Sequence, residues 1–556
     1  MSSEVYDIAF ADEAEGEDLS LSDFTVERRD YQLTAKLAVT DGWGGHRKQL
    51  LDMATGTGKT TVFGMVAKDE VDKGGRVLVL AHRDKLVFQA AGRIAGEMRL
   101  EVGVEKAGNH AALTDPVVVA SIQSMTPERL ARWPRDHFSL VVADESHHTL
   151  ATSWMRVLNH FDGHAKVLGV TATPDLAGRR QLGEYYEKVA YRYQITQAVR
   201  DGWLVPLVMK SIPLEIDLRG LRPGRTANGS DFTDGQLHDR MVPVIDALAK
   251  QICTLAFNRK TIAFVPTIEC SELLANGVNR YGLKGIFVSG DTERGHDERT
   301  TDFINSGSGT VLCNAALYAE GADFPDVDCI VFGRCTRSRA FYAQQAGRGT
   351  RTLPGVTSGQ DGPLLRRRAI AQSAKPDCLM LDPLWISDRL DLCQPYDLVT
   401  TKPEVRARME AMAGQDDLVG MEEMATRDMI EALATEARKQ ARKEARTIDP
   451  LTWAAIVGDE DLATWEPETA FESKPPTPDQ MKWLAGQHID TSKVRFFGQA
   501  SLLMSRMLVR YRYKLATAKQ IEFLRVLGVP RKSAANLNQK EASEMIARQK
   551  KKLGWK

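Results

Sequence analysis

Short, continuous apolar runs alternate with stretches of helical length over most of the first 385 residues. Five of these runs lie within residues 25–207, and all are rich in Val or Leu and bounded by polar or glycine-containing turns: KQLLDMA, RVLVLAH, PVVVAS, LVVAD and KVLGVTAT. Such runs are typical of strands that are buried on both faces of a parallel sheet. The pattern therefore predicts an α/β domain over residues 25–207, with helices on both faces of its sheet.

The same alternation returns in residues 246–385 and predicts a second α/β domain. Its apolar runs are TIAFVP, KGIFVSG, GTVLCNAAL and DCIVFGR. Residues 215–240 are rich in Gly, Asp and Arg and show little periodicity, and they lie in the segment 208–245 between the two domains. We expect a connector or a surface insertion there.

Beyond residue 386 the strand pattern stops. Residues 403–446 are dense in Glu, Ala, Arg and Met, which predicts a helical linker region over residues 386–474 that ends near the sequence KPPTP. Residues 475–556 contain a weak internal repeat, because TPDQMKWLAG and GQASLLMSRM resemble TAKQIEFLRVLG and KEASEMIARQ. The repeat aligns Gln480 with Gln520 and the pair Ala500-Ser501 with Ala542-Ser543. Two copies of one helical hairpin are therefore expected.

Charge is distributed unevenly, although the formal net charge is −1. Residues 1–27 hold nine acidic side chains and no basic one, and we expect residues 1–24 to be disordered. Residues 491–556 hold sixteen Lys or Arg and three Glu, a balance of +13. A polyanion suits this segment, and we predict that residues 475–556 bind nucleic acid.

The sequence shows no pattern for export, membrane insertion or disulfide pairing. There is no signal-peptide pattern and no apolar stretch near the ~20 residues of a membrane helix, so we expect a cytoplasmic protein. The seven cysteines lie between Cys253 and Cys393 and form no CxxC pair. Reduced thiols are therefore expected, in place of a disulfide framework, a zinc site or an iron–sulfur cluster.

The sequence ATGTGKT (residues 54–60) directly follows the apolar run KQLLDM. A glycine-rich turn between a strand and a helix directs backbone N–H groups and the helix dipole at one point, where phosphate binds. Lys59 would neutralise the β- and γ-phosphates of ATP, and the Thr60 hydroxyl would bind Mg²⁺. The residues predicted to hold the nucleotide here are Thr55, Gly56, Thr57, Gly58, Lys59, Thr60 and Thr61.

Two adjacent carboxylates follow further along the chain, where LVVADESHH places Asp144 and Glu145 at the end of a Val-rich strand. Such a pair is costly unless a cation or an exposed site receives it. Asp144 would hold Mg²⁺ through water, and Glu145 would polarise the attacking water as general base. The two motifs together predict hydrolysis of ATP with Mg²⁺ as cofactor.

With ATGTGKT and DESH in this order, the chain resembles the superfamily 2 helicases. The resemblance is greatest to the group that contains XPB, the phage branch-migration helicase UvsW and the motor subunits of some restriction enzymes. It covers residues 28 to about 355, and Met53, where the general phosphate-loop pattern has glycine, is also what this family shows. The resemblance implies two tandem RecA-like domains with ATP in the cleft between them, followed here by a mainly helical C-terminal region.

The resemblance also implies roles for residues of the first domain. The motif RDYQ (residues 29–32) implies that Arg29 and Gln32 recognise adenine. AHRDKLVFQ and ASIQS are similar to motifs that contact the nucleic-acid backbone, here through Arg83, Ser121 and Gln123. TATP (residues 171–174) is similar to the motif that couples the ATP state to strand grip, which implies this role for Thr171 and Thr173 together with His147.

In the second domain, the motifs FVPT, VSGDT and NAALYAEGADFP imply nucleic-acid contacts at Thr267, Ser289 and Asn314 and nucleotide contacts at Gly321 and Asp323. QQAGRGTR (residues 344–351) resembles motif VI, of the form QxxGRxxR, with Gln344 in coupling and Arg348 and Arg351 in catalysis. A guanidinium stabilises the transferring phosphoryl group and contributes about 10³–10⁵ to the rate in related systems. If both arginines reach ATP, the active site is complete only when the cleft closes.

The resemblance does not reach VRYRYK (residues 509–514), in which Arg510, Tyr511, Arg512, Tyr513 and Lys514 alternate cations with rings. Cations for phosphates and rings for base stacking suit single-stranded or junction DNA. The alternative is a helix whose aromatic residues are core and whose cations are solvated.

The sequence favours an ATP-dependent DNA helicase or translocase that unwinds or remodels duplex, forked or branched DNA. Three alternatives remain: an RNA helicase, a double-strand DNA translocase subunit of a restriction or defence complex that separates no strands, and an ATP-gated DNA-binding clamp or adaptor. The clamp is disfavoured because the chain retains all of the predicted catalytic residues Lys59, Glu145, Arg348 and Arg351, of which an inactive ATPase would usually have lost one. No residue of the sequence is an unambiguous reader of the 2′-hydroxyl that distinguishes RNA from DNA, so the RNA alternative stays open.

Overall fold

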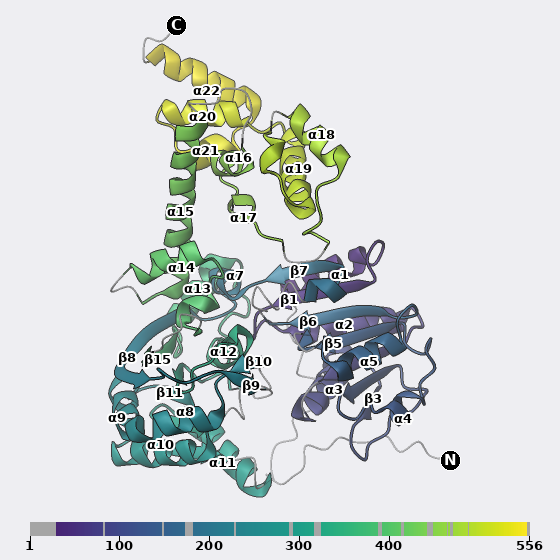
Figure 1. The fold of residues 1–556 in the computed structure, drawn as a ribbon, viewed down its shortest axis with the longest axis vertical. Coiled ribbons are helices and arrows are strands. Elements are labelled where there is room, and N and C mark those ends of the chain that lie inside the picture. Colours follow the sequence, from purple (N-terminus) through teal and green to yellow (C-terminus); the bar gives the residue numbers. More distant parts are fainter. Residues whose placement is uncertain are drawn as a thin grey trace.

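The computed structural model describes residues 29–81, 84–146, 149–172, 182–226, 229–288, 293–315, 324–386, 392–412, 416–441, 449–463, 465–467, 471–487 and 489–552. Two α/β domains lie side by side, and a helical module stands at the C-terminal end (Figure 1). Both sheets are parallel, which confirms the predicted fold class. Within the described ranges, no helix is both long and apolar enough to cross a bilayer.

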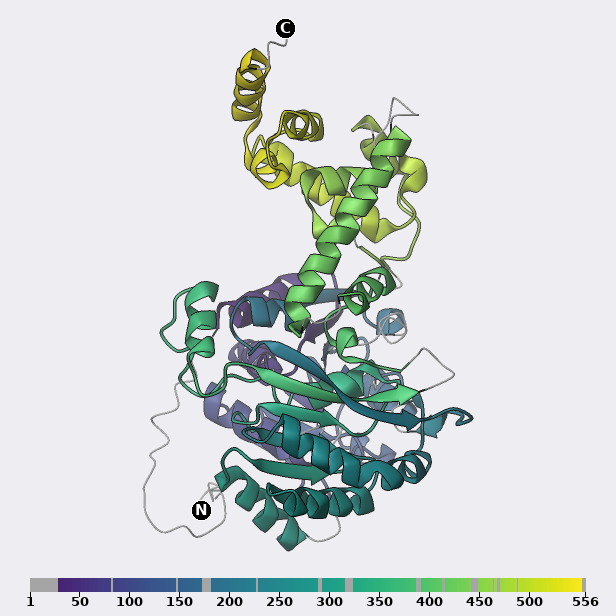
Figure 2. The same ribbon diagram turned by 90° about the vertical axis from the view of Figure 1, so that its left-hand side faces the viewer.

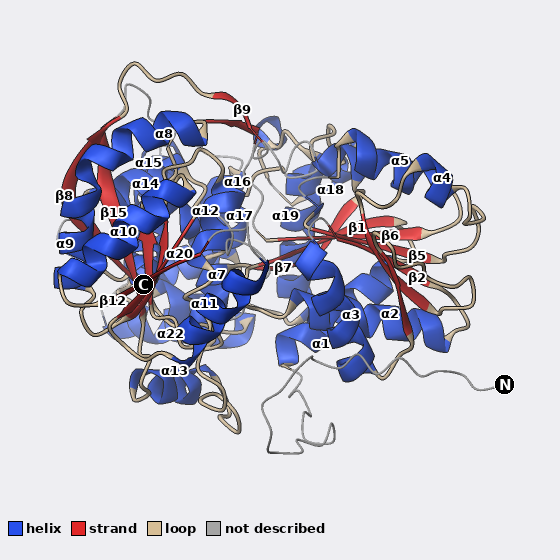
Figure 3. Ribbon diagram, turned by 90° about the horizontal axis from the view of Figure 1, so that it is seen from below, coloured by secondary structure: helices blue, strands red, loops and turns tan. Residues whose placement is uncertain are grey.

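The first domain is built on a seven-stranded sheet with the order β3-β4-β2-β5-β6-β1-β7. Its strands are β1 (Lys48–Met53), β2 (Val77–Ala81), β3 (Val102–Glu105), β4 (Val117–Ser121), β5 (Leu140–Asp144), β6 (Lys166–Thr171) and β7 (Lys188–Tyr193). Its helices are α1 (Asp30–Gly42), α2 (Lys59–Asp72), α3 (Asp84–Met98), α4 (Pro127–Leu130), α5 (Thr152–His160) and α7 (Ile195–Arg200). Helices flank the sheet on both sides (Figure 3). The five apolar runs form β1, β2, β4, β5 and β6.

The second domain contains a six-stranded sheet with the order β12-β13-β11-β14-β15-β8. Its strands are β8 (Leu207–Asp217), β11 (Lys260–Phe264), β12 (Lys284–Val288), β13 (Thr310–Asn314), β14 (Cys329–Phe332) and β15 (Cys378–Ile386), and a hairpin is formed by β9 (Gly224–Thr226) and β10 (Gly229–Asp231). Its helices are α8 (Asp234–Met241), η2 (Val242–Val244), α9 (Ile245–Leu255), α10 (Ile268–Arg280), α11 (Glu293–Asn305), α12 (Arg339–Ala346) and α13 (Pro363–Ala371).

Residues 208–245 differ from the expected connector. Nearly all of β8 lies in this segment, and β8 pairs in parallel with β15 as the edge strand of the second sheet. Ile212 and Ile216 of β8 are buried in the core of the second domain with Phe232, just before α8. An edge strand exposes alternate residues, so its apolar positions form no continuous run, and the sequence pattern does not reveal β8 as a strand.

The described residues of the C-terminal region contain helices joined by loops and form no strand. Its elements are η3 (Pro395–Leu398), α14 (Pro403–Glu410), α15 (Leu418–Ala441), α16 (Pro450–Val457), α17 (Glu460–Ala463), α18 (Pro478–Gly486), η4 (Thr491–Lys493), α19 (Phe497–Arg512), α20 (Ala518–Val526), α21 (Arg531–Asn536) and α22 (Gln539–Lys552). The long helix α15 runs from the α/β domains to the helices α16 to α22, which we call the terminal module (Figure 2). Its first turns are fixed to the first domain by Arg200, which forms ion pairs with Glu422 (2.8 Å) and Glu423 (2.7 Å).

The terminal module contains two hairpins that make the same hydrogen bonds at aligned positions. Thr477 and Thr517 each form a capping box with the glutamine three residues later. The amide of Gln480 donates to Ser501 Oγ (2.8 Å), and the amide of Gln520 donates to Ser543 Oγ (2.9 Å). Each glutamine therefore connects the two helices of its hairpin, and the same geometry is repeated in both hairpins.

Candidate active site

The parallel sheet of the first domain brings the predicted catalytic motifs to one edge. Parallel strands have their carboxyl ends on the same side, and β5, β6 and β1 are neighbours in that order. Asp144 at the end of β5 is in register with Val170 of β6, and Thr171 with Asp52 of β1. The phosphate loop, the two carboxylates and the first threonine of TATP therefore surround one site.

The phosphate loop is a tight turn that ends at the first residue of α2. Gly56 and Gly58 have φ values of +86° and +79°, which only glycine adopts without strain. The α2 helix begins at Lys59, so the N–H groups of its first turn have no partner within the helix and point out of its positive end. This loop therefore offers the backbone N–H donors and the positive electrostatic potential that bind a chain of phosphates.

The motif RDYQ holds the phosphate loop in place. The Tyr31 hydroxyl (2.7 Å) and the Gln32 side-chain amide (3.1 Å) both donate to the carbonyl oxygen of Thr57. The Gln32 side-chain oxygen also accepts from the backbone N–H of Arg29 (3.1 Å) at the start of α1. Gln32 therefore connects α1 to the loop, and its contact with adenine stays a prediction.

Two threonines of the loop have their hydroxyl groups bonded within the protein. Thr57 Oγ1 donates to the carbonyl of Ala54 (2.6 Å), and Thr61 Oγ1 donates to Glu97 on α3 (2.9 Å). Their side chains stabilise the loop and the packing of α2 on α3. Any contact of Thr61 with phosphate would therefore come from its backbone N–H.

Glu145 adopts a strained backbone conformation at the tip of β5. Its φ is +52°, a region that costs a residue with a Cβ about 1–3 kcal/mol, and its N–H donates to Asp144 Oδ1 (3.0 Å). Strain of this kind persists where the surrounding structure fixes a functional side chain. The adjacent carboxylates are thus fixed on the edge that also carries Lys59 and Thr60.

The second domain contacts the phosphate loop directly. A Cβ added to Gly347 would lie 2.5 Å from Thr55 Cβ, and one added to Gly56 would lie 3.4 Å from Arg351 Cγ. The backbone of this segment is anchored as well, because Val205 N–H donates to the Thr350 carbonyl (2.9 Å). The segment that carries Arg348 and Arg351 therefore faces the interdomain gap and packs on the loop.

Positive charge gathers on this side of the loop. Burial, with smaller effects from Arg93 and Arg29, lowers the pKa of the Arg351 guanidinium to about 10, so Arg351 is still charged at neutral pH. Like charges held together in this way favour an anion as their partner. The triphosphate of ATP fits this requirement.

Trp203, which the sequence analysis missed, links the two domains beside RDYQ. Its ring lies 4.7 Å from the Arg29 guanidinium and 4.1 Å from that of Arg366 on α13. Arg366 also donates to the Asp201 carbonyl (2.7 Å). Gly202, with φ +73°, permits this approach, because a Cβ there would lie 2.7 Å from Arg366 Cβ. The only hint of this contact in the sequence is the pair Gly202-Trp203, which lies near the predicted boundary between the two domains.

Two predicted coupling residues carry buried polar atoms. Among the described residues, Thr171 Oγ1 and Gln344 Nε2 are buried and have no hydrogen-bond partner. Such an atom costs about 1–3 kcal/mol, which fits residues that gain partners in another state of the cycle. Six further predicted residues lie outside the described residues: Arg83, His147, Thr173, Ser289, Gly321 and Asp323.

The predicted backbone contacts lie at or just beyond strand ends and make local bonds. Ser121 Oγ donates to Gln123 Oε1 (2.6 Å), and Thr267 caps α10. Asn314 is buried and donates to the Ala263 carbonyl (3.2 Å). These bonds shape the carboxyl edges of both sheets, and the nucleic-acid contacts themselves stay predictions.

The C-terminal VRYRYK segment is largely exposed. Tyr511 and Tyr513 are 81% and 65% exposed, and Arg512 and Lys514 are exposed beside them. Arg510 differs, because its guanidinium donates to the carbonyls of Ala516 (2.7 Å) and Ala535 (3.0 Å). Arg510 therefore closes the junction between the two hairpins, and the rings and the other cations face solvent.

Comparison with known proteins identifies both α/β domains. Residues 25–176 match the family model for the type III restriction enzyme res subunit, and residues 243–352 match the helicase conserved C-terminal domain. These two matches, in this order along the chain, are consistent with a superfamily 2 helicase. The predicted resemblance is thereby confirmed.

Similar proteins include helicases and restriction enzymes. The putative ATP-dependent helicase IRC3 of Saccharomyces cerevisiae is 26% identical over 58% of this chain and 49% of its own length. The EcoAI type I restriction endonuclease subunit of Escherichia coli is 27% identical over 55% of this chain and 42% of its own. This chain thus spans about half or less of these relatives. The structure of the type ISP restriction-modification enzyme LlaBIII bound to DNA shares the fold, with TM-score 0.54 and 17% identity over 95% of this chain and 40% of that one.

We expect Glu145→Gln to leave ATP binding intact and to lower the rate of hydrolysis by about 10²–10⁴, the usual contribution of a general base. The measurement is steady-state ATPase activity beside equilibrium binding of labelled ATP. Glu128→Gln, on the exposed face of α4, is the matched control. An undiminished rate in Glu145→Gln would show that the base is elsewhere.

Arg351→Gln should reduce kcat by about 10³–10⁵, because the guanidinium would be lost from the transferring phosphoryl group. ATP binding should change far less than kcat. Arg367→Gln, which removes an exposed arginine of α13, should keep wild-type activity. Equal rates for Arg351→Gln and the wild type would remove Arg351 from the helicase active site.

Gly347→Ala should slow hydrolysis by about 100-fold, because the added methyl group forces the second domain away from Thr55 and displaces the arginines. Nucleotide binding to the first domain should persist. Gly92→Ala on α3, where an added Cβ meets no atom within 4 Å, is the control. Wild-type kcat in Gly347→Ala would contradict the close contact of the two domains.

Proposed function

We propose that this chain is an ATP-dependent DNA helicase or translocase, which couples ATP hydrolysis to movement on DNA and to unwinding or remodelling of duplex, forked or branched DNA. The observation that carries the proposal is the packing of the segment with Arg348 and Arg351 on the phosphate loop of the other domain. A site completed from two domains opens and closes with each catalytic cycle. If each domain grips the strand, this motion becomes stepping.

The residues of the site fit ATP and Mg²⁺. Lys59 and the N–H groups at the start of α2 would bind the phosphates, and the Thr60 hydroxyl and the Asp144 carboxylate are oxygen donors of the kind that Mg²⁺ prefers. ATP supplies the γ-phosphoryl group and the free energy of its transfer to water. Glu145 would accept the proton of the attacking water, and Arg351 would stabilise the charge on the phosphoryl oxygens.

DNA is favoured over RNA as the track because the relatives include endonuclease subunits of restriction enzymes, from EcoAI and EcoKI. A putative RNA helicase of Methanocaldococcus jannaschii also matches, over 31% of this chain, so RNA is the second candidate. The restriction-enzyme relatives also support a double-strand translocase that separates no strands. The intact catalytic residues argue against an ATP-gated clamp.

The deciding experiment measures ATPase stimulation by single-stranded DNA, duplex DNA, forked DNA and RNA, together with strand displacement from substrates with 3′ or 5′ overhangs. A helicase gives DNA-stimulated hydrolysis and displaces strands. A double-strand translocase gives duplex-stimulated hydrolysis without displacement. Stimulation by RNA alone, or by no nucleic acid, would contradict the proposal.

We predict that Lys59→Ala abolishes both ATP turnover and strand displacement, because the phosphates lose their principal counter-charge. Lys68→Ala, at a partly exposed position on the same helix α2, should keep both activities. The assay is phosphate release with saturating DNA. Normal turnover in Lys59→Ala would remove the phosphate-loop assignment.

A further inference from the structure

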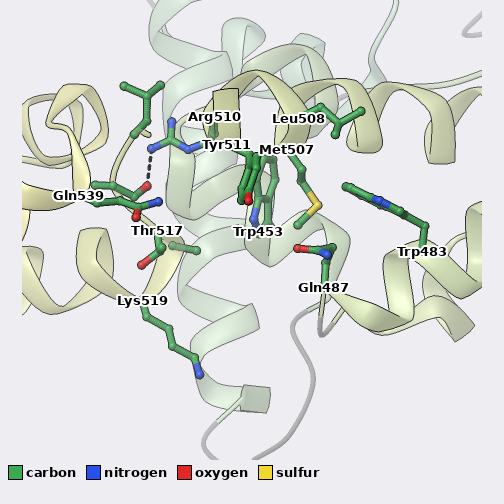
Figure 4. Close-up of a pocket in the computed structure, with 13 residues that line it drawn as sticks. Trp453, Trp483, Gln487, Met507, Leu508, Arg510, Tyr511, Thr517, Lys519 and Gln539 are labelled. Carbon is green, nitrogen blue, oxygen red and sulfur yellow. Dashed lines mark hydrogen bonds between the residues drawn. The ribbon is translucent and has the colours of Figure 1, made fainter. Parts of the chain in front are cut away.

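The terminal module contains a groove that the motor does not use. It has a volume of about 560 Å³ and lies where α16, α18, α19 and the α20 hairpin meet (Figure 4). Its aromatic side chains are Trp453 of α16, Trp483 of α18 and Tyr511 of α19. Met507 and Gln487 lie between the two tryptophans in this view. Rings, a thioether and an amide form the kind of surface on which a planar base stacks.

The groove keeps large apolar groups in contact with water. Tyr511 is 81% exposed and Leu508, one helical turn away on the same wall, is 49% exposed. Exposed apolar groups that gather around a hollow mark a binding site more often than isolated ones do. Trp453, by contrast, is 5% exposed and anchored in the core. The groove therefore has a floor that is fixed by the buried Trp453 and a wall on which the Tyr511 ring is exposed.

The side chains that line the groove are positively charged or neutral, which favours an anionic ligand. The charged side chains that line the groove are Arg510 and Lys519, and no acidic residue lines it among the described residues. Arg512 and Lys514 are exposed next to Tyr511, and residues 491–556 have a balance of +13. An acidic strand with planar rings complements this surface, whereas a neutral apolar helix of another protein would leave the cations unpaired.

The groove is also held in shape before any ligand arrives. Arg510 ties the end of α19 to the carbonyls of Ala516 and Ala535 in the second hairpin. Gln520 fixes that hairpin through Ser543 Oγ (2.9 Å). A site that is already ordered loses little conformational entropy on binding.

We propose that this groove is a second nucleic-acid site, which takes an unpaired base of single-stranded DNA against Tyr511 while Lys519 binds the adjoining phosphate. The proposal rests on the proposed function, because it assigns the DNA strand of that motor to the terminal module. A duplex keeps its bases stacked inside and does not fill the groove. The module therefore favours single-stranded DNA over blunt duplex.

The test measures binding of fluorescein-labelled oligothymidine to the full-length protein by fluorescence anisotropy. Tyr511→Ala should weaken binding roughly 5- to 100-fold, the range expected when one stacked base loses its ring. Tyr511→Phe should bind like the wild type, whereas Tyr511→Leu should resemble Tyr511→Ala. Since Tyr511 is almost fully exposed, these substitutions do not threaten the fold.

Two controls separate stacking from charge. Lys519→Ala should reduce the slope of log affinity against log salt by about 0.7, the value for one phosphate of a single strand. Lys493→Ala removes an exposed lysine outside the groove and should leave the affinity unchanged. An abasic strand of equal length should bind weakly to the wild type and to Tyr511→Ala alike.

Wild-type affinity in Tyr511→Ala or Tyr511→Leu, or equal binding of abasic and oligothymidine strands, would overturn the groove as a base site. A groove that binds a protein partner would give that result. The ATPase of the same variants keeps the two proposals distinct. Nucleic-acid-stimulated hydrolysis with unaltered oligothymidine binding would reject the groove alone, whereas absence of stimulated hydrolysis in the wild type would reject the motor.

Discussion

The contact between Gly347 of the second domain and Thr55 of the phosphate loop is the constraint on which the structure depends. A glycine is required on one side because the Thr55 side chain lies too close to Gly347 to leave room for a methyl group. The same contact fixes the position of Arg351, whose charge is held near two other arginines. Several guanidinium groups thus lie together at the interdomain gap, where the anionic triphosphate of ATP would fit.

Other contacts of the two α/β domains hold the phosphate loop and the segment of Gly347 in position. The parallel sheet brings Asp144 and Thr171 to the edge that carries the phosphate loop, and RDYQ clamps that loop through the carbonyl of Thr57. Trp203 lies against arginines from both domains, next to the same motif. These few direct contacts would therefore connect nucleotide binding to the relative position of the two domains. The helix α15 extends this linkage to the terminal module, since Arg200 binds its first turns.

The sequence allowed prediction of features that depend on neighbours along the chain. Continuous apolar runs identified the central strands, and the spacing within ATGTGKT and DESH identified the residues at their ends. The edge strands β3, β7 and β8 were not predicted, because a strand that is buried on one side has no continuous apolar run. For the same reason, residues 208–245, which contain most of β8, were expected to form a connector. The approach of Arg366 to Trp203 was not predictable, since it joins residues far apart in the chain through a turn at Gly202.

The central claim is that one ATP is held between the phosphate loop and the arginines of the opposite domain. The most direct measurement is an experimental structure of the protein with ADP and beryllium fluoride, with a strand of DNA present. The account predicts Lys59 on one side of the γ-phosphate mimic and the Arg348 and Arg351 guanidinium groups on the other, each within about 3 Å of its oxygens. Arginines that point away from the mimic while both domains enclose the nucleotide would contradict it.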